Sequence, residues 1–119
     1  MSNVLVVEEL YDEFKERFLS AAAALRVGSG LDPATELGPV VSARALSKLH
    51  DQIEAGIAEG ADLLLDGRHP EVPGFPDGYF LGATVFEAEP GMEIFEEEAF
   101  GPVRCMKKVK DLREGIDVI

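Results

Sequence analysis

Two stretches of helical periodicity, separated by a segment rich in Gly and Pro, constrain the fold of this chain more than any other feature. In the first stretch, apolar residues recur at spacings of three and four, which places them on one face of a helix: Leu10, Phe14, Phe18, Ala21 and Leu25. Carboxylates crowd the first turns, where they stabilise the helix dipole, and Gly28 is the expected C-cap.

The second stretch follows a predicted loop, residues 28–41, that contains three Gly and two Pro. Ser42 is the expected N-cap, Gly60 the expected end, and the apolar stripe comprises Leu46, Leu49, Ile53 and Ile57. Gly56 lies inside this helix, where Gly costs about 1 kcal/mol relative to Ala. We interpret it as a mark of close packing or of a C-terminal turn.

Short apolar segments around these helices predict a sheet. Residues 4–7 and 103–109 are predicted strands, and residues 61–65 are apolar on both faces, which predicts a central strand. Residues 79–86 are expected to be extended, with these side chains on one face: Tyr79, Leu81, Ala83 and Val85.

Asp111 is expected to cap a last helix, after a surface excursion over residues 66–78 and the final strand. The order of elements is an α/β pattern. We therefore expect one domain over residues 1–119, built as a short sheet flanked by helices, because 119 residues allow one modest core.

Charge and composition exclude several classes of function. The chain carries 23 Asp and Glu against 11 Lys and Arg, a formal net charge of -12. Nucleic acid is a poor partner, because phosphate binding needs a basic face. No apolar run approaches the ~18 residues of a membrane span and no signal-peptide pattern follows Met1, so we expect no membrane partner and a cytoplasmic location.

Cys105 is the only cysteine, which excludes an internal disulfide and a Cys-based zinc site. His50 and His69 are far apart in the sequence and have no evident partners, so surface positions are expected for both. Neighbouring cations could lower the pKa of Cys105 and make it a nucleophile, but a lone cysteine in a strand is more typical of a core. No metal site is predicted.

Residues 93–102, E-I-F-E-E-E-A-F-G-P, are the most unusual segment. Glu96, Glu97 and Glu98 could be metal ligands or acid–base groups, or Glu98 and Phe100 could face a ligand together. The alternative is a solvated acidic helix start followed by a turn into the next strand. Both interpretations stay open on the pattern alone.

Two further patterns are weak. Gly28-Ser29-Gly30 lacks the third glycine and the following helix of a phosphate-binding loop. The other is the basic cluster Arg104, Lys107, Lys108 and Lys110. It could receive an anionic ligand or an acidic partner, or it could line one strand face and balance nearby Glu residues, which is the commoner case.

Several motifs, taken in order, resemble the aldehyde dehydrogenase superfamily over nearly the whole chain. The opening V-L-V-V-E-E-L-Y-D-E-F resembles the strand and helix that follow the family's catalytic cysteine region. R-V-G-S-G-L-D-P-A-T-E-L-G-P-V-V-S is similar to the family loop K-V-G-x-P-x-D-P-x-T-x-x-G-P-x-I-S. G-Y-F-L-G-A-T-V-F follows in the family's order, and E-E-E-A-F-G-P-V resembles the signature E-E-x-F-G-P-V.

The resemblance implies that Glu98 and Phe100 bind the cofactor. In the family, the Glu two positions before the signature Phe contacts the nicotinamide ribose, and the Phe packs near the nicotinamide ring. A carboxylate can accept two hydroxyl donors, and an apolar ring holds the cofactor in place. The chain departs from the family at Ala83, Ala99 and the basic residues after Val103.

Nothing in this sequence matches the family's nucleophilic cysteine, general base, oxyanion-hole asparagine, cofactor-binding half or oligomerisation strand. The resemblance thus implies part of the catalytic domain of an NAD(P)-dependent enzyme that oxidises an aldehyde to an acid or an acyl thioester. Alone, it should be inactive and bind no cofactor. The alternative is a binding or assembly module that associates with itself, or with a full-length dehydrogenase, through uncovered sheet edges. A weak cofactor sensor built on Glu98 and Phe100 is the least favoured interpretation.

Overall fold

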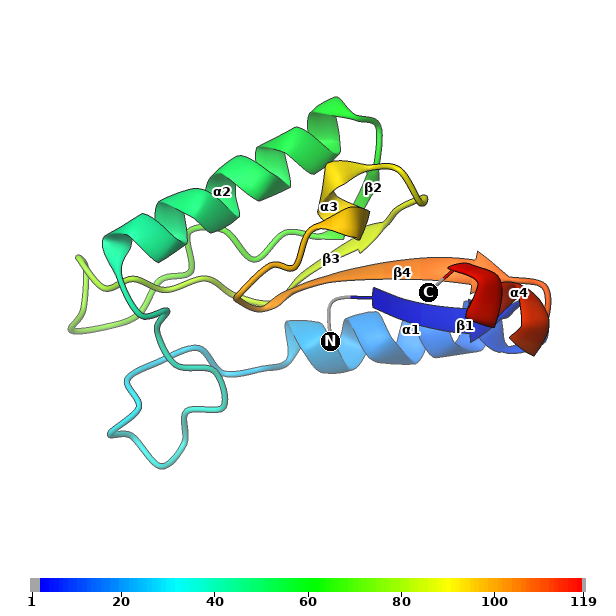
Figure 1. Cartoon of the computed structure of the whole chain (residues 1–119). Helices are drawn as coiled ribbons and strands as arrows, with labels where there is room; N and C mark the ends of the chain where they lie inside the picture. Colours follow the sequence, from blue (N-terminus) through cyan, green and yellow to red (C-terminus); the bar gives the residue numbers. More distant parts are fainter. Residues whose placement is uncertain (1–2, 119) are drawn as a thin grey trace.

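The computed structural model describes residues 3–118 and contains a four-stranded sheet with helices on both faces (Figure 1). The expected α/β class, a short sheet flanked by helices, is confirmed. The elements, in chain order, are β1 (Asn3–Val7), α1 (Glu8–Ala23), α2 (Ala43–Ala58), β2 (Asp62–Leu65), β3 (Thr84–Glu87), α3 (Glu93–Glu96), β4 (Val103–Val109) and α4 (Leu112–Val118).

The strands lie in the order β1-β4-β3-β2. β4 runs parallel to both of its neighbours, with Val4 opposite Met106 and Phe86 opposite Cys105. β2 is antiparallel to β3. The segment 97–102 therefore leads directly into a central strand, which fixes the position of that segment on the rest of the fold.

Helices on the two faces of the sheet bury two apolar clusters. α2 and α3 lie above the sheet in Figure 1, and Leu49, Ile53, Ile94 and Phe95 from these helices pack with Phe86. α1 lies below the sheet, where it covers a smaller cluster formed by Val6, Tyr11, Val85 and Met106. No helix among the described residues is long and apolar enough to cross a membrane.

The prediction that residues 61–65 form a central strand is wrong, because β2 lies at an edge of the sheet. Its apolar character has another cause. Leu63 packs against the α2 and α3 cluster, whereas Leu64 and Leu65 pack against the α1 cluster. An edge strand covered by helices on both faces has the same hydrophobic pattern as a central one.

The first helix forms as predicted, but its end and its buried face differ. α1 ends at Ala23, and Gly28 lies beyond the helix end, with its N–H donating to the carbonyl of Leu37 at 3.0 Å. Leu10, Phe14 and Leu25 of the predicted stripe are exposed. The residues of α1 that pack on the sheet are Tyr11, Phe18, Leu19 and Ala22.

The second helix follows the prediction closely. The Ser42 Oγ accepts a hydrogen bond from the Ala45 N–H at 3.1 Å, and Gly60 follows the helix with φ of +92°. Gly56 marks close packing: a Cβ at this position would lie 3.1 Å from the Cβ of Ile94. Asp111 caps α4, with its Oδ1 accepting from the Glu114 N–H at 3.0 Å.

The predicted extended segment 79–86 forms a strand only from Thr84. Its side chains do not share one face, because Leu81 packs on the α2 side of the sheet and Val85 on the α1 side. The chain enters β3 through Gly82, whose N–H donates to the carbonyl of Gly67 at 2.7 Å. This contact closes the base of the long loop between β2 and β3.

Candidate functional site

The turn between α3 and β4 presents two sequence-predicted residues to solvent. Ala99 is buried, whereas Glu98 is exposed and Phe100 is 83% exposed. The Gly101 N–H donates to the Ala99 carbonyl at 2.9 Å, which tightens the chain around Phe100. The buried residue anchors the turn, and the bulky apolar ring beside it projects outward.

Contacts with two other elements hold this turn in place. The Pro102 carbonyl accepts from the Thr84 N–H at 2.8 Å, which joins the turn to β3. A Cβ on Gly101 would lie 2.6 Å from Leu49 Cδ1, so glycine allows the turn to approach α2. The turn that carries Phe100 is therefore held against both β3 and α2.

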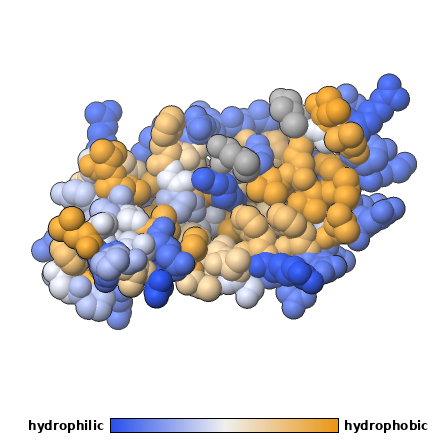
Figure 2. Space-filling model, turned by 90° about the horizontal axis from the view of Figure 1, so that it is seen from below, coloured by the Kyte–Doolittle hydropathy of each residue, from blue (hydrophilic) through white to orange (hydrophobic). Residues whose placement is uncertain are grey.

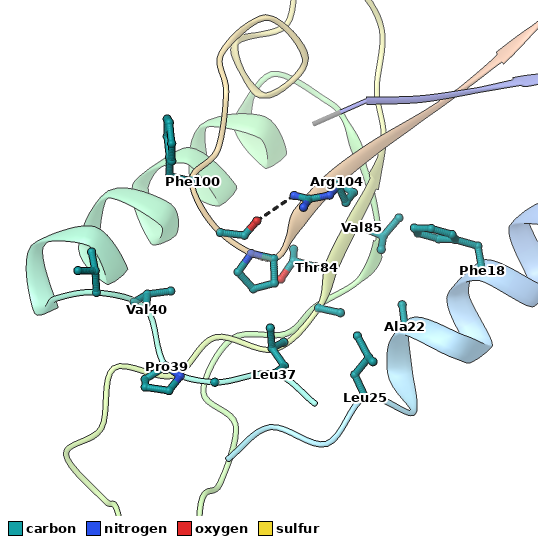
Figure 3. Close-up of a pocket in the computed structure, with 15 residues that line it drawn as sticks. Phe18, Ala22, Leu25, Leu37, Pro39, Val40, Thr84, Val85, Phe100 and Arg104 are labelled. Carbon is teal, nitrogen blue, oxygen red and sulfur yellow. Dashed lines mark hydrogen bonds between the residues drawn. The ribbon is translucent and has the colours of Figure 1, made fainter. Parts of the chain in front are cut away.

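A groove of about 720 Å³ opens beside Phe100 (Figure 3). The C-terminal half of α1, the loop before α2 and the starts of β3 and β4 form its walls. The lining is largely apolar: Phe18, Ala22, Leu25, Leu37–Val41, Ala83–Val85, Phe100–Pro102 and Arg104. Sequence periodicity missed this groove, because its walls come from four segments that only the fold brings together.

The basic cluster does not lie on one strand face. Arg104 and Lys108 share the face of β4 that carries Met106, whereas Lys107 lies on the opposite face and pairs with Glu89. Lys108 lies 4.9 Å from the ring centroid of Tyr11 and 3.9 Å from Asp12. The expected balance by carboxylates holds for these two lysines, but the pleat of β4 divides the cluster.

The acidic run divides into residues with different roles. Glu96 ends α3, and its Oε1 accepts from the Gly91 N–H at 2.8 Å, so this carboxylate stabilises the preceding turn. Glu97 and Glu98 are exposed. Within residues 3–118, no group of three or more His, Cys, Asp or Glu is arranged to hold a metal ion.

Cys105 lies in the core. It is 2% exposed, and its Sγ donates to the Ile94 carbonyl at 3.1 Å. Burial raises the pKa of the Cys105 thiol from 9.0 to about 11. The structure thus supports the core interpretation of this cysteine and not the nucleophile.

We expect Cys105 to resist thiol reagents while the protein is folded. A thiolate is the reactive form, and a rise in pKa of about two units lowers its fraction about 100-fold near neutral pH. Labelling with an aromatic disulfide should be at least that much slower in buffer than in guanidinium chloride. Equal labelling rates would contradict the buried position.

The raised pKa of Cys105 also makes folding stability depend on pH. Because the unfolded chain loses the thiol proton first, the free energy of unfolding falls as pH rises from 9.0 towards about 11.

The two histidines, for which no partner is evident in the sequence, lie side by side; His69 is exposed as expected, whereas His50 is half-buried. The ring centroids of His50 and His69 lie 5.3 Å apart in an edge-to-face arrangement. His50 belongs to α2, and His69 follows β2 with φ of +58°. The connection at Gly60 turns the chain back beside α2, so two residues with no local relation become neighbours.

Exposed apolar side chains gather on the outside of α1 and α4. Figure 2, which views the molecule from below Figure 1, shows a broad hydrophobic area bordered by hydrophilic residues. On and just after these helices the exposed apolar residues are Leu10, Phe14, Leu25, Leu112 and Ile116. The helical stripe predicted for α1 is therefore real, but part of it faces away from the sheet.

These features match a known family along the whole sequence. The sequence matches the aldehyde dehydrogenase family over residues 1–119. A malonate-semialdehyde dehydrogenase of Oceanobacillus iheyensis is 41% identical over 118 residues, which are 98% of this chain and 24% of that protein. A probable methylmalonate-semialdehyde/malonate-semialdehyde dehydrogenase [acylating] of Drosophila pseudoobscura is 46% identical over 99 residues, 82% of this chain and 19% of that protein.

Solved structures show the same fold. HpcC from Thermus thermophilus has a TM-score of 0.91 and 36% identity, covering 98% of this chain and 24% of that one. A putative methylmalonate-semialdehyde dehydrogenase from Sinorhizobium meliloti, complexed with NAD, has a TM-score of 0.94 and 30% identity, covering 99% and 24%. The chain belongs to the aldehyde dehydrogenase family, and it spans about a quarter of the length of these relatives.

Proposed function

We propose that this chain forms one wall of the nicotinamide end of the cofactor site in an NAD(P)-dependent aldehyde dehydrogenase. The observation that carries the proposal is the turn 97–102, which holds an exposed carboxylate and an exposed aromatic ring two residues apart. When bound, the cofactor accepts a hydride from the substrate. Glu98 would accept hydrogen bonds from ribose hydroxyls, and Phe100 would offer an apolar surface to the ring.

The residues fit only part of such a cofactor. The loop before α2 begins with Gly28 and Gly30, and a hydrogen bond from the Gly28 N–H to the Leu37 carbonyl closes it. No helix starts directly after these glycines, so they place no helix N-terminus where it could receive a pyrophosphate. With a net charge of -12, the chain also opposes binding of phosphates. We therefore propose that the isolated chain binds NAD weakly at most and has no turnover.

The names of the relatives support a semialdehyde that carries a carboxylate as the substrate class of the complete enzyme. Neither Glu98 nor Phe100, the two residues of the cofactor wall, would select that substrate. The proposal for this chain therefore concerns the cofactor, and it can be tested with any aldehyde that the complete enzyme accepts.

The isolated chain provides the first test. With pure 119-residue protein, we expect aldehyde-dependent NADH formation equal to that of a blank without protein, and a flat calorimetric titration at millimolar NAD, because two contacts give little affinity. Cofactor-dependent oxidation above the blank would contradict the proposal that the catalytic groups lie outside this chain.

Transplantation provides the sharper test. When residues 1–119 replace the matching segment of the Oceanobacillus relative, we expect Glu98→Gln to raise KM for NAD about tenfold or more, the usual cost of losing bonds to a charged acceptor. Glu97→Gln is the matched control, because Glu97 is also exposed and lies one position away. Equal effects of the two substitutions would count against a specific role of Glu98.

A second function, self-association, is favoured by the uncovered surfaces. β1 is an edge strand without a charged residue, and the groove beside Phe100 is largely apolar. The net charge of -12 opposes pairing of two copies, so salt should promote it. We expect the mass from light scattering at micromolar concentration to rise with ionic strength; a monomer at every salt concentration would exclude this function.

A further inference from the structure

We propose that Arg104 is a positioning residue that holds the turn carrying Phe100 in the orientation needed for cofactor binding. This inference rests on the proposed cofactor role of Glu98 and Phe100. The Arg104 Nη1 donates to the carbonyl of Gly101 at 2.9 Å and to that of Val103 at 2.6 Å. Figure 3 shows the guanidinium reaching back from β4 to the turn.

The peptide unit between Gly101 and Pro102 explains why this contact matters. Proline has no N–H, so the Gly101 carbonyl is the only backbone hydrogen-bonding group of that unit. Among the residues that the structure describes, Arg104 donates to this carbonyl. The guanidinium therefore restrains the peptide plane between Gly101 and Pro102, the second plane after Phe100.

The other supports of the turn act on either side of this peptide plane. The Gly101 N–H is held by Ala99, and the Pro102 carbonyl is held by Thr84. A charge-assisted hydrogen bond is stronger than a neutral one, so the Arg104 contact adds substantial restraint at the Gly101 carbonyl, which neither of the other two bonds holds. Without it, the Gly101 carbonyl would lose its donor and the turn that carries Phe100 would be held less firmly to β4.

Folding stability alone does not account for an arginine at this position. Arg104 is half-buried at the wall of a largely apolar groove, and no carboxylate within residues 3–118 forms an ion pair with it. Placing an unpaired cation there costs free energy relative to an apolar side chain. Its bonds to the carbonyls of Gly101, in the turn, and Val103, at the start of β4, are what the arginine supplies and an apolar residue would not.

The test uses the 119-residue chain and requires no cofactor. We expect Arg104→Met to speed amide hydrogen exchange at Gly101 about tenfold, because a charge-assisted bond restrains the turn. Exchange at Cys105 and Lys107 in β4 should stay unchanged. Lys108→Met is the matched control, because Lys108 lies on the same strand face and contacts Tyr11 instead of the turn. Arg104→Lys should restore part of the protection.

Two outcomes would overturn the proposal: unchanged exchange at Gly101, or a uniform increase along β4, which would indicate a general structural role. In the transplanted dehydrogenase, Arg104→Met should raise KM for NAD about three- to tenfold with little change in kcat, because binding is what the turn supplies. If Gly101 loosens but KM stays unchanged while Glu98→Gln raises it, the positioning role fails and the proposed function stands. If Glu98→Gln also has no effect, the proposed function fails.

Discussion

Replacing Phe86 with Ala is expected to lower the free energy of unfolding by about 3–5 kcal/mol, the usual cost of removing a buried aromatic ring. Phe86 lies in β3, is fully buried and packs in the larger apolar cluster together with Ile53 and Ile94. Because a domain of this size is stable by only about 5–15 kcal/mol, the substitution should remove a large part of that stability. Urea unfolding followed by circular dichroism measures the change.

Phe100→Ala provides the control for Phe86→Ala. The same side chain is removed, but Phe100 is 83% exposed, so the expected change is within about 0.5 kcal/mol. Comparable losses for the two variants would mean that Phe100 is buried in solution, for example in a contact between two copies. A small loss for Phe86→Ala would contradict the cluster on the α2 side of the sheet.

Replacing Gly67 with Ala is expected to destabilise the fold by about 1–3 kcal/mol through overpacking. A Cβ at Gly67 would lie 2.2 Å from the carbonyl oxygen of Gly82, so one of the two backbones must move. That movement would strain two hydrogen bonds, from the Gly82 N–H to the Gly67 carbonyl at 2.7 Å and from the Gly67 N–H to Thr84 Oγ1 at 3.1 Å. Thermal unfolding should show the loss directly.

The matched control is Gly30→Ala. No atom lies within 4 Å of a Cβ at Gly30, and its φ does not require glycine. Alanine restricts the unfolded chain, so the expected change ranges from none to a gain of about 1 kcal/mol. If Gly67→Ala is as neutral as Gly30→Ala, the close approach of the two ends of the long loop is wrong.

Local signals predicted much of this structure correctly. The Ser42 cap, the Gly60 helix end and the Asp111 cap are where the sequence places them, because each depends on residues within one turn of the chain. Gly28 is the exception among the predicted helix ends and caps. Its turn is closed by Leu37, a residue that a capping rule does not consider.

The candidate site was predicted as a pair of residues and not as a surface. Motif order pointed to Glu98 and Phe100, and the structure places both on one exposed turn. The role of Arg104 was not predicted, because a cation in a strand gives no sign of which backbone carbonyl it will reach. The pairing of His50 with His69 was missed because it depends on the chain turning back beside α2, which no local pattern of either residue shows.

By itself, the sequence determined the class of fold, the helices and their principal caps, and membership of the aldehyde dehydrogenase family, because these depend on periodicity, turn chemistry and motif order. Only the tertiary structure decided that β2 lies at an edge, which face of α1 is buried, and that four segments enclose a groove beside Phe100. These features depend on how distant segments pack on each side of the sheet. A helical or strand pattern shows that a residue belongs to an apolar face, but not which partner that face will meet.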